Sequence, residues 1–218
     1  QAAHGCTLAN YWMHVGLLTI NDEKMSKSLG NSITIGEFLS DHHPEVLRHF
    51  MLGSHYRSPI NYTESAIANS QQALERLYTA IRGLEHGVDI DAEHPKYKAF
   101  LDAMSDDFNT PQAFAVLFDL TREINRLRQD GDMTQALKLA TIMRSCGALL
   151  GVLQEGADTF LQSGAQQLDV DAIDRLVQAR DLARTQKDWQ QADELRQQLD
   201  DLGVILEDTA KGTQWRMP

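Results

Sequence analysis

Residues 11–31 of the chain read Tyr-Trp-Met-His-Val-Gly-Leu-Leu-Thr-Ile-Asn-Asp-Glu-Lys-Met-Ser-Lys-Ser-Leu-Gly-Asn. Residues 11–21 are rich in β-branched, aromatic and other apolar types, which predicts a buried strand that ends at a polar turn. The loop after it, residues 24–28, carries Lys24 and Lys27 among hydroxyl side chains. Two ammonium groups on flexible stems suit a triphosphate whose charge grows as pyrophosphate leaves. A solvated basic turn is the competing interpretation.

The composition as a whole is that of a globular protein. The 218 residues are 42% hydrophobic and 23% charged, which suits one large domain or two to three small ones with a sizeable core. The formal net charge of −11 has the wrong sign for a protein that neutralises phosphates over its whole surface. Local basic patches on an acidic body are still compatible with nucleic-acid recognition.

Cysteine usage and hydropathy indicate neither a disulfide framework nor a membrane protein. Cys6 and Cys146 stand far apart without a Cys-x-x-Cys pair, so we expect no zinc site and a reducing, cytoplasmic compartment. We assign no metal to His4 and Cys6, because two such residues without further ligands do not complete a site. No apolar run approaches the roughly 20 residues of a membrane helix, so no membrane contact is expected. A start on Gln1 without a methionine indicates a piece of a longer protein.

After the loop, the spacing of apolar side chains predicts mostly helices. Two short helices are expected near residues 35–39 and 44–53, and Pro44 suits the first turn of the second one. Intervals of three, four and seven residues then predict longer helices, over residues 63–83, over 97–104, from 110 onward and over 133–153. The helix that starts near residue 110 is expected to be capped by Thr110, with Pro111 in its first turn. Helices joined by short loops predict a bundle.

The last fifty residues have a different pattern. A shift to Gly, Ser, Gln and Ala predicts a linker at residues 157–168. Two helices are expected beyond it, over residues 169–185 and 189–201, with Trp189 on the apolar face of the second and Gly203 at its left-handed end. Residues 204–206 and 214–216 suit two strands of a hairpin. The tail is therefore predicted to be a small α+β domain.

The loop and three further stretches resemble one family of enzymes. Residues 24–28 match, letter for letter, the Lys-Met-Ser-Lys-Ser signature of class I aminoacyl-tRNA synthetases, and residues 29–31 extend the match. Residues 11–16, 55–62 and 106–111 are similar to the cysteinyl-tRNA synthetase family within that class. The second of these stretches discriminates best, whereas the third also occurs in related synthetases. Together with the tail, the resemblance covers nearly the whole chain.

The resemblance implies a mainly α fold in four parts. Residues 1–62 would be the end of a Rossmann-type catalytic sheet, with the loop and a contact region for the tRNA stem. Residues 63–156 would be a helical bundle that binds tRNA, and residues 157–168 the linker. Residues 169–218 would be a small α+β anticodon-binding domain.

The resemblance also implies the chemistry of the loop. It implies that five residues bind ATP, which enters with Mg²⁺: Lys24, Met25, Ser26, Lys27 and Ser28. Lys24 and Lys27 would be catalytic residues, and Lys27 would contact the phosphates and stabilise the transition state of adenylation. The strand before the loop agrees with the context in which this signature occurs.

Two elements of the family are missing from the sequence. Class I synthetases carry a His-x-Gly-His element that works with the loop on ATP, and the 218 residues contain none. The family also holds its cysteine substrate on a zinc ion, whose ligands would precede this chain. We therefore expect the chain to bind cysteine tRNA but to lack aminoacylation activity alone. Cysteine-dependent exchange between ATP and pyrophosphate would contradict that expectation.

The tail is similar to the anticodon-binding domain of the bacterial family members, in Arg-x-x-Lys-Asp-Trp at 184–189 and Val-Ile-Leu-Glu-Asp at 204–208. The similarity implies that four side chains face the anticodon bases: Arg184, Trp189, Asp193 and Asp208. The guanidinium and the indole suit base stacking, and the carboxylates suit the amino groups of guanine or cytosine. Ordinary surface and packing roles are the competing interpretation, and for Trp189 packing is the commoner role.

Three arginines on one predicted helix are further candidates for the tRNA backbone: Arg122, Arg126 and Arg128. A solvated face shared with Glu123 and Asp130 is the favoured interpretation of that helix. We assign no chemistry to the histidines near residues 42–55.

The function that the resemblance implies is ATP-dependent activation of cysteine and its transfer to cysteine tRNA. Two alternatives stay open. One is a stand-alone tRNA-binding module, against which the adenylation loop argues, because a pure binder does not need it. The other is a ligase of the same superfamily that joins cysteine to an amino sugar, against which the anticodon tail at residues 169–218 argues.

Overall fold

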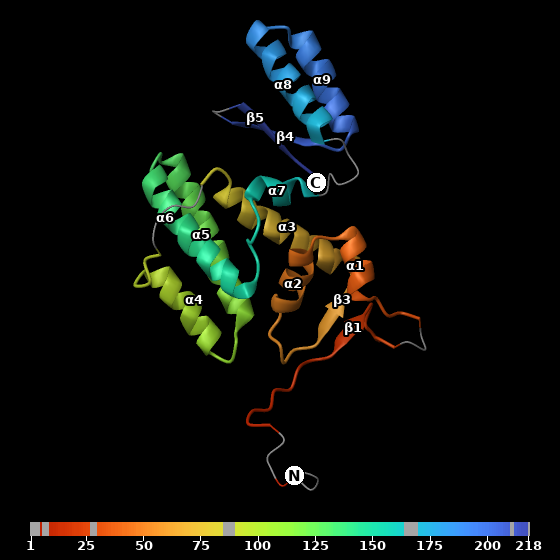
Figure 1. Ribbon diagram of the computed structural model, residues 1–218, viewed down its shortest axis with the longest axis vertical. Coiled ribbons are helices and arrows are strands. Elements are labelled where there is room, and N and C mark those ends of the chain that lie inside the picture. The colour runs from red at the N-terminus through yellow and green to blue at the C-terminus, as the bar shows by residue number, and fades with distance from the viewer. Residues whose placement is uncertain are drawn as a thin grey trace.

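A computed structural model of the chain is built mainly of helices (Figure 1). It describes residue 5 and residues 9–26, 30–84, 90–163, 170–209 and 212–217. In chain order the elements are β1 (Leu18–Ile20), β2 (Glu23–Lys24), α1 (Ile35–Asp41), α2 (Pro44–Leu52), β3 (Ile60–Tyr62), α3 (Glu64–Ile81), α4 (Pro95–Ser105), α5 (Thr110–Gln129), α6 (Met133–Leu150), α7 (Ala157–Leu161), α8 (Val170–Gln186), α9 (Trp189–Asp201), β4 (Ile205–Thr209) and β5 (Gly212–Arg216). The mainly α fold with a small α+β end is confirmed.

The N-terminal sheet has β1 at its centre, between β2 and β3. β1 runs antiparallel to β2 and parallel to β3, with Leu18 opposite Ile60. Asn21 and Asp22 turn the chain from β1 into β2 with positive φ angles of 50° and 66°. A tight hairpin turn needs this backbone conformation, and Asn and Asp adopt it more readily than most residues.

The strand predicted at residues 11–21 is much shorter in the structure. Its ladder begins at Leu18, and within the described ranges residues 11–17 belong to no strand. The Gly16 N–H donates to the Tyr56 carbonyl at 2.7 Å, and a Cβ on Gly16 would lie 2.0 Å from the Ser58 carbonyl oxygen. Close passage along residues 56–60 therefore requires glycine here. Apolar composition predicts where a strand can form, but a strand forms only where a neighbour pairs with its backbone.

The helices before the bundle begin as their capping side chains dictate. The Thr34 hydroxyl accepts from the Glu37 N–H at 3.2 Å, and the Glu37 carboxylate accepts from the Thr34 N–H at 2.7 Å, so α1 begins with a capping box. His43 Nδ1 accepts from the Glu45 N–H at 3.2 Å at the start of α2, with Pro44 in the first turn as predicted.

The cap of α5 differs from the prediction by one residue. Asn109, rather than Thr110, caps this helix, because Asn109 Oδ1 accepts from the Gln112 N–H at 3.2 Å. Thr110 is already the first helical residue and is buried. Both residue types can cap a helix, so the sequence alone does not distinguish two neighbours.

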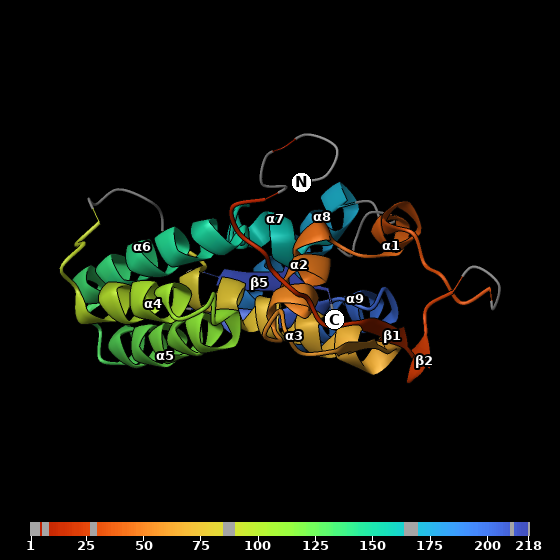
Figure 2. The same cartoon turned by 90° about the horizontal axis from the view of Figure 1, so that it is seen from below.

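The bundle packs α3, α5 and α6 together with α4 on one side and α2 on the other, as Figure 2 shows from below. Its largest fully buried side chains are Leu74, Leu77, Tyr78, Ile81, Phe100, Leu117, Leu120, Ile124, Met143 and Phe160. The predicted helix spacing produces this apolar face. None of the described helices is long and apolar enough to span a membrane.

One buried carboxylate joins three parts of the bundle. Glu45 on α2 accepts from the Tyr78 hydroxyl at 3.0 Å and from the N–H groups of Leu153 and Gln154 at 2.9 Å. A buried carboxylate is costly unless it is hydrogen-bonded, and these donors satisfy it. Burial, followed by the charge of Glu45, raises the pKa of Tyr78 far above its ordinary value.

The predicted linker at residues 157–168 contains a helix. α7 occupies residues 157–161, and its Phe160 and Leu161 are buried in the same core as the bundle. The Phe160 ring stacks on Tyr78 with centroids 4.1 Å apart. Five residues are too few for helical periodicity to be recognised in a Gly- and Gln-rich stretch, so the composition suggested a linker alone.

The tail forms the other end of the molecule, beyond α7 (Figure 1). α8 and α9 lie side by side, and the β4–β5 hairpin pairs Ile205 with Arg216 and Leu206 with Trp215. Its own core consists of Ile173, Val177, Leu199, Val204 and Trp215. Gly203 ends α9 with φ 75°, and both helices and the hairpin confirm the predicted α+β tail.

Candidate functional site

The base of the lysine loop is held by an asparagine. Asn31 Oδ1 accepts from the Ser26 N–H at 2.9 Å, and its Nδ2 donates to the Lys24 carbonyl at 3.3 Å. One side chain thus connects the two ends of the loop. The Lys24 side chain is exposed, and Met25 and Ser26 are half-buried. Lys27 and Ser28, the other predicted ATP-binding residues, lie outside the described residues.

A second asparagine fixes the hairpin before the loop. Asn61 on β3 accepts from the Asp22 N–H at 2.9 Å and donates to the Asp22 carboxylate at 2.7 Å. The Thr19 hydroxyl also donates to Asn61 Oδ1, at 3.1 Å. The turn that starts the loop is therefore attached to the parallel strand β3. The hairpin lies at the side of the molecule away from α4, α5 and α6 (Figures 1 and 2).

In the tail, the structure brings Arg184 and Asp208 together. Asp208 Oδ1 accepts from Arg184 Nη1 at 2.8 Å, from Arg180 Nη1 at 3.2 Å and from the Thr213 hydroxyl at 2.9 Å. Asp181 completes the group, because its carboxylate accepts from the Thr213 N–H at 3.0 Å. These contacts attach the tip of the hairpin to the last turns of α8.

The Asp208 carboxylate is ionised over the whole physiological range. The hydrogen bond from Arg180 is the main cause that lowers its pKa to about 2, with smaller contributions from Thr213 and Arg184. Its side chain is half-exposed, whereas Arg180 is buried. An ionised carboxylate only accepts hydrogen bonds, so Asp208 can bind a donor such as a base amino group.

Trp189 lies at the same end of the tail as Arg184. Lys187, with φ 61°, turns the chain between α8 and α9, and the Lys187 N–H donates to the Arg184 carbonyl at 3.1 Å. Trp189 is the first residue of α9 and is 60% exposed, so its predicted place on the packed face of that helix is wrong. Ala192 and Leu199, which the same spacing places on that face, are buried. An indole exposed to this extent is available for stacking.

Asp193 follows Trp189 by one helical turn. Residues four apart lie on the same face of a helix, so this carboxylate shares the face of the indole. Asp193 is exposed. The four predicted tail residues therefore come from the end of α8, the start of α9 and the tip of the hairpin.

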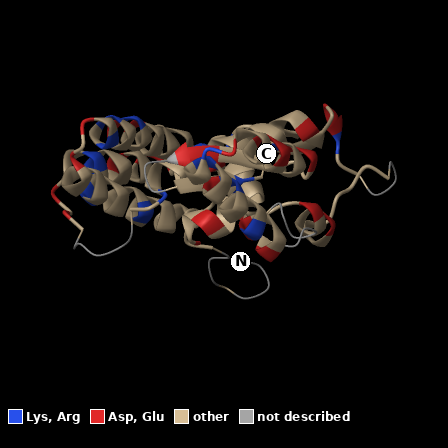
Figure 3. Cartoon of the chain, turned by 90° about the horizontal axis from the view of Figure 1, so that it is seen from above, with Lys and Arg blue, Asp and Glu red and all other residues tan. Residues whose placement is uncertain are grey.

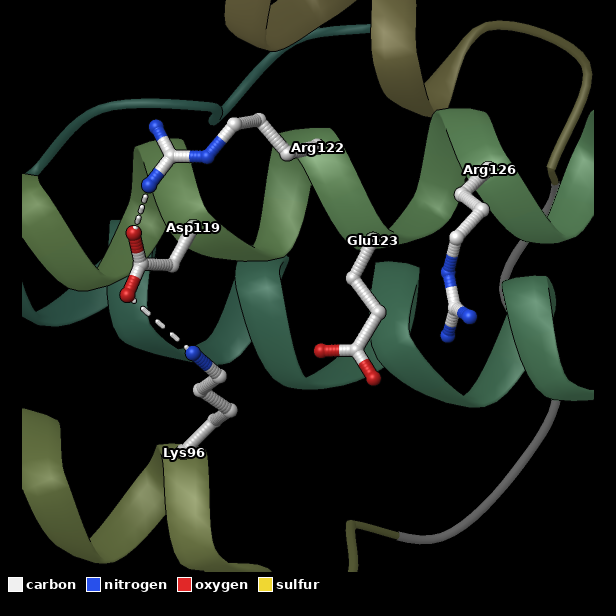
Figure 4. Close-up of a pocket in the computed structure, with 5 residues that line it drawn as sticks. All are labelled: Lys96, Asp119, Arg122, Glu123 and Arg126. Carbon is white, nitrogen blue, oxygen red and sulfur yellow. Dashed lines mark hydrogen bonds and ion pairs between the residues drawn. The ribbon is translucent and has the colours of Figure 1, made fainter.

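Arg122 and Arg126 on α5 line an open pocket together with acidic side chains. Figure 4 shows Lys96 and Arg122 on either side of Asp119, with Glu123 and Arg126 along the same open pocket. Lys96 Nζ lies 3.1 Å from Asp119. Acidic and basic residues lie next to one another here, and Figure 3 shows both kinds along the helices of the chain. This pairing agrees with the solvated face that the sequence favours.

Arg128 has a structural contact. Its Nη1 donates to the carbonyls of Ala80 and Arg82, at 3.0 Å each, at the C-terminal end of α3. Cations suit this end of a helix, where carbonyl groups lack partners. Arg128 thus ends α3, a role that spacing on α5 did not suggest.

Two of the stretches that carry the resemblance meet in space. Asp107 accepts from the Tyr56 hydroxyl at 2.6 Å and from Arg57 Nε at 2.7 Å. The hydrogen bond from Arg57 is the main cause that lowers the pKa of Asp107 to about 2. Asp107 and the exposed Phe108 both have positive φ, 51° and 53°. Sequence reasoning identified both stretches but not this contact between them.

The described residues contain no group of three or more His, Cys, Asp and Glu side chains that could hold a metal ion. His4 and Cys6 lie outside the described residues. Cys146 is buried in the bundle, and burial raises its pKa to about 12. A thiol in that state is a packing group and a poor nucleophile.

Family models match the chain in three places. Residues 1–72 match the model described as "tRNA synthetases class I (C) catalytic domain". Residues 99–154, which span most of α4, α5 and α6, match the DALR domain. Residues 170–216, the tail, match the "Cysteinyl-tRNA ligase anticodon binding domain". The catalytic-domain match places the chain among the class I aminoacyl-tRNA synthetases.

Comparison with individual proteins gives the family. A cysteine–tRNA ligase of Pseudomonas putida is 50% identical over 218 residues, which cover 100% of this chain and 47% of the length of that ligase. One from Alkalilimnicola ehrlichii is 49% identical over 99% of this chain and 47% of its own length. One from Nitrosococcus oceani is 44% identical over 99% of this chain and 50% of its own length. The chain belongs to the cysteinyl-tRNA synthetase family. It spans about half the length of these relatives.

Proposed function

We propose that the chain is the part of a cysteine–tRNA ligase that reads the anticodon and carries the loop for the ATP phosphates. In the whole reaction, the carboxylate of cysteine attacks the α-phosphorus of ATP and pyrophosphate leaves. A ribose hydroxyl at the end of the tRNA then attacks the activated carbonyl, and AMP leaves. Cysteine, ATP with Mg²⁺ and cysteine tRNA are the proposed partners, and the cytoplasm is the proposed compartment.

The observation that supports the proposal is an exposed indole, Trp189, at the start of α9, close in the chain to the end of α8, where Arg184 pairs with Asp208. Single-stranded RNA bases are bound by stacking on aromatic or guanidinium planes and by hydrogen bonds to their Watson–Crick edges. Trp189 and Arg184 offer the planes, and Asp193 and Asp208 offer acceptors. The contacts of Asp208 with Arg180, Arg184 and Thr213 all use Oδ1.

Carboxylate acceptors also account for the acidity of the protein. The net charge of −11 argues against a surface that neutralises many phosphates. Specificity for a base requires only a few polar groups and one stacking plane, and these can be acidic. The affinity contributed by the tail is therefore expected to depend less on salt than that of a basic RNA-binding domain.

The loop is proposed to hold the pyrophosphate end of ATP. Asn31 and Asn61 fix its base, and Lys24, the last residue of β2, is exposed to solvent. Lys27 is proposed to stabilise the negative charge on the departing pyrophosphate. Zinc in the longer protein is proposed to be held by residues outside this chain. Because the sequence contains no His-x-Gly-His element, full catalysis is proposed to need groups that this chain does not provide.

Anticodon discrimination tests the proposal. Fluorescence anisotropy at one fixed salt concentration should compare cysteine tRNA with the same tRNA carrying one changed anticodon base. One lost base contact should weaken binding about tenfold or more, since a mismatch typically costs about 1–3 kcal/mol. Equal dissociation constants for the two tRNAs would contradict anticodon reading by the tail.

A further inference from the structure

Arg82 lies where the bundle meets the tail. It follows α3, and its side chain is only 5% exposed. Its guanidinium makes three contacts in different directions. Nε donates to Asp158 on α7 at 2.6 Å, Nη1 to Glu207 on β4 at 3.3 Å, and Nη2 to the Trp215 carbonyl on β5 at 3.0 Å. One side chain thus connects α3, α7 and both strands of the hairpin.

The backbone of Arg82 is itself held in place. Its carbonyl accepts from Arg128 on α5. This contact fixes the backbone at the end of α3, from which the Arg82 side chain extends to the tail. A guanidinium presents its donors in a rigid planar fork, whereas a lysine would place one ammonium group among three acceptors. The site therefore requires arginine geometry and not only a positive charge.

A second arginine reinforces the same junction from the other side. Arg216 on β5 donates through Nε to Glu207 at 3.0 Å, and its Nη1 lies 3.5 Å from Glu75 on α3. The two oxygens of Glu207 therefore contact different arginines, Oε1 that of the tail and Oε2 that of the bundle. The Met217 N–H also donates to the Leu161 carbonyl at 3.1 Å.

These polar contacts join two separate apolar cores. The buried tail core, described above, shares no residue with the buried core of the bundle and α7. Apolar contacts are non-directional, whereas charged hydrogen bonds fix an orientation. A polar interface between two domains normally permits relative motion unless specific contacts prevent it. Arg82 and Glu207 provide such contacts.

We infer that Arg82 is a positioning residue for tRNA recognition, which holds the tail in one orientation on the bundle so that both engage the same tRNA. The inference rests on the proposed function, because it assumes that the tail binds the anticodon loop and the bundle another part of the tRNA. When two sites act on one ligand, the second contact is intramolecular, and its strength depends on how well the geometry is fixed. Arg82 affects binding without touching RNA.

Binding of two RNAs to the full 218-residue chain tests the inference. One probe is whole cysteine tRNA, and the other is an RNA hairpin that contains only its anticodon stem and loop. Arg82→Gln should weaken binding of the whole tRNA about tenfold or more, since two linked sites can gain about 10²–10⁴-fold over one and the variant loses part of that gain. The anticodon hairpin should keep its affinity, because it needs the tail alone. Small-angle scattering of the free variant should show a larger radius of gyration.

Two further variants control the result. Arg76→Gln removes the same charge from an exposed position on α3, where the guanidinium lies over the Phe118 ring. It measures the effect of losing one cation from the bundle, and Arg82→Gln should weaken binding of the whole tRNA by more. Glu207→Gln loosens the junction from the tail side and should repeat the effect of Arg82→Gln, so it decides the question if Arg82→Gln does not fold. The inference is overturned if both junction variants retain affinity for whole tRNA, or if they lose both RNAs equally.

Failure of the proposed function gives a different result. In that case the unmodified chain itself binds neither RNA, and the inference falls with it. If the unmodified chain binds both RNAs while Arg82→Gln behaves like Arg76→Gln, the tail reads RNA but Arg82 does not position it.

Discussion

The bundle and the tail are stabilised in different ways. The bundle buries large apolar side chains from α2 to α7, and its buried carboxylate Glu45 is fully surrounded by donors. The core cluster of the tail has five buried apolar side chains among the described residues, and a charged group forms around the buried Arg180. A small apolar core contributes little stabilisation, so polar contacts provide a larger share of the stability of the tail.

This difference has a functional consequence. The buried carboxylate of the bundle, Glu45, has its partners within the bundle and serves the fold. In the tail, Arg184 and Asp208 hold the hairpin on α8 and are also the groups proposed to face RNA. Substitutions in the tail therefore need separate measurements of stability and binding, whereas substitutions in the bundle core are expected to act through stability.

The largest expected effect is in the bundle. Leu117 is fully buried, so Leu117→Ala should lower the free energy of unfolding by about 3–4 kcal/mol, through lost burial and the cavity that remains. Chemical denaturation followed by circular dichroism measures it. Leu149→Ala, at an exposed position on α6, is the matched control and should change the free energy of unfolding by less than about 0.5 kcal/mol. Similar losses for both would contradict the assigned core.

The tail should respond locally to the same substitution. Leu199 is fully buried in the small core, and Leu199→Ala should destabilise the tail by about 2–3 kcal/mol, since a small domain relaxes around the cavity. Hydrogen exchange resolved by residue should show faster exchange in α8 and α9, with protection of α5 and α6 unchanged. Equal loss of protection in the bundle would show that the two cores unfold as one.

A smaller effect is expected from the charged group in the tail. The pKa of Asp208 is lowered in the folded protein from 3.8 to about 2, so its contribution is present above about pH 4 and is lost as the pH falls towards 2. Because the carboxylate is half-exposed, solvent screening limits this contribution to about 0.5–1 kcal/mol. Asp208→Asn should reduce the loss of tail stability between pH 4 and 2 by that amount. If tail stability depends on pH in the same way in the variant, Asp208 does not stabilise the tail through these charged contacts.

The smallest effect on stability is expected at Trp189. The indole is mostly exposed, so Trp189→Ala should change the free energy of unfolding by less than about 0.5 kcal/mol. Thermal unfolding of the variant beside the unmodified chain measures this. If the free energy of unfolding fell by several kcal/mol, Trp189 would be a packing residue, which is the commoner role for a tryptophan.

Local sequence chemistry predicted most helices and few long-range contacts. Pro44 and Thr63 lie at the starts of α2 and α3 as expected, because capping depends on neighbouring residues. Residues 11–17 were predicted as strand from apolar content, but pairing with another segment decides strand formation. α7 was not predicted, because a helix of five residues is too short to show a periodic spacing of apolar side chains.

The sequence predicted the residues of the candidate site better than the contacts between them. The lysine loop was found by its signature, because the five residues are consecutive in the sequence. Asn61 on β3 holds the turn before the loop, and no spacing in the sequence suggests that contact. Arg184 and Asp208 were proposed separately, and only the fold shows that they form a pair with the buried Arg180. Trp189 was placed on the wrong face because helical periodicity is least reliable in a first turn.

The central claim is that the tail reads the anticodon through Trp189 and its neighbours. Its most direct test is the ratio of dissociation constants for the tRNA with one changed anticodon base and for cysteine tRNA, measured at fixed salt. The ratio should be about ten or more for the unmodified chain, remain high for Trp189→Phe, which keeps a stacking ring, and fall towards one for Trp189→Ala. A ratio near one for the unmodified chain, or a ratio that Trp189→Ala leaves unchanged, would contradict the claim.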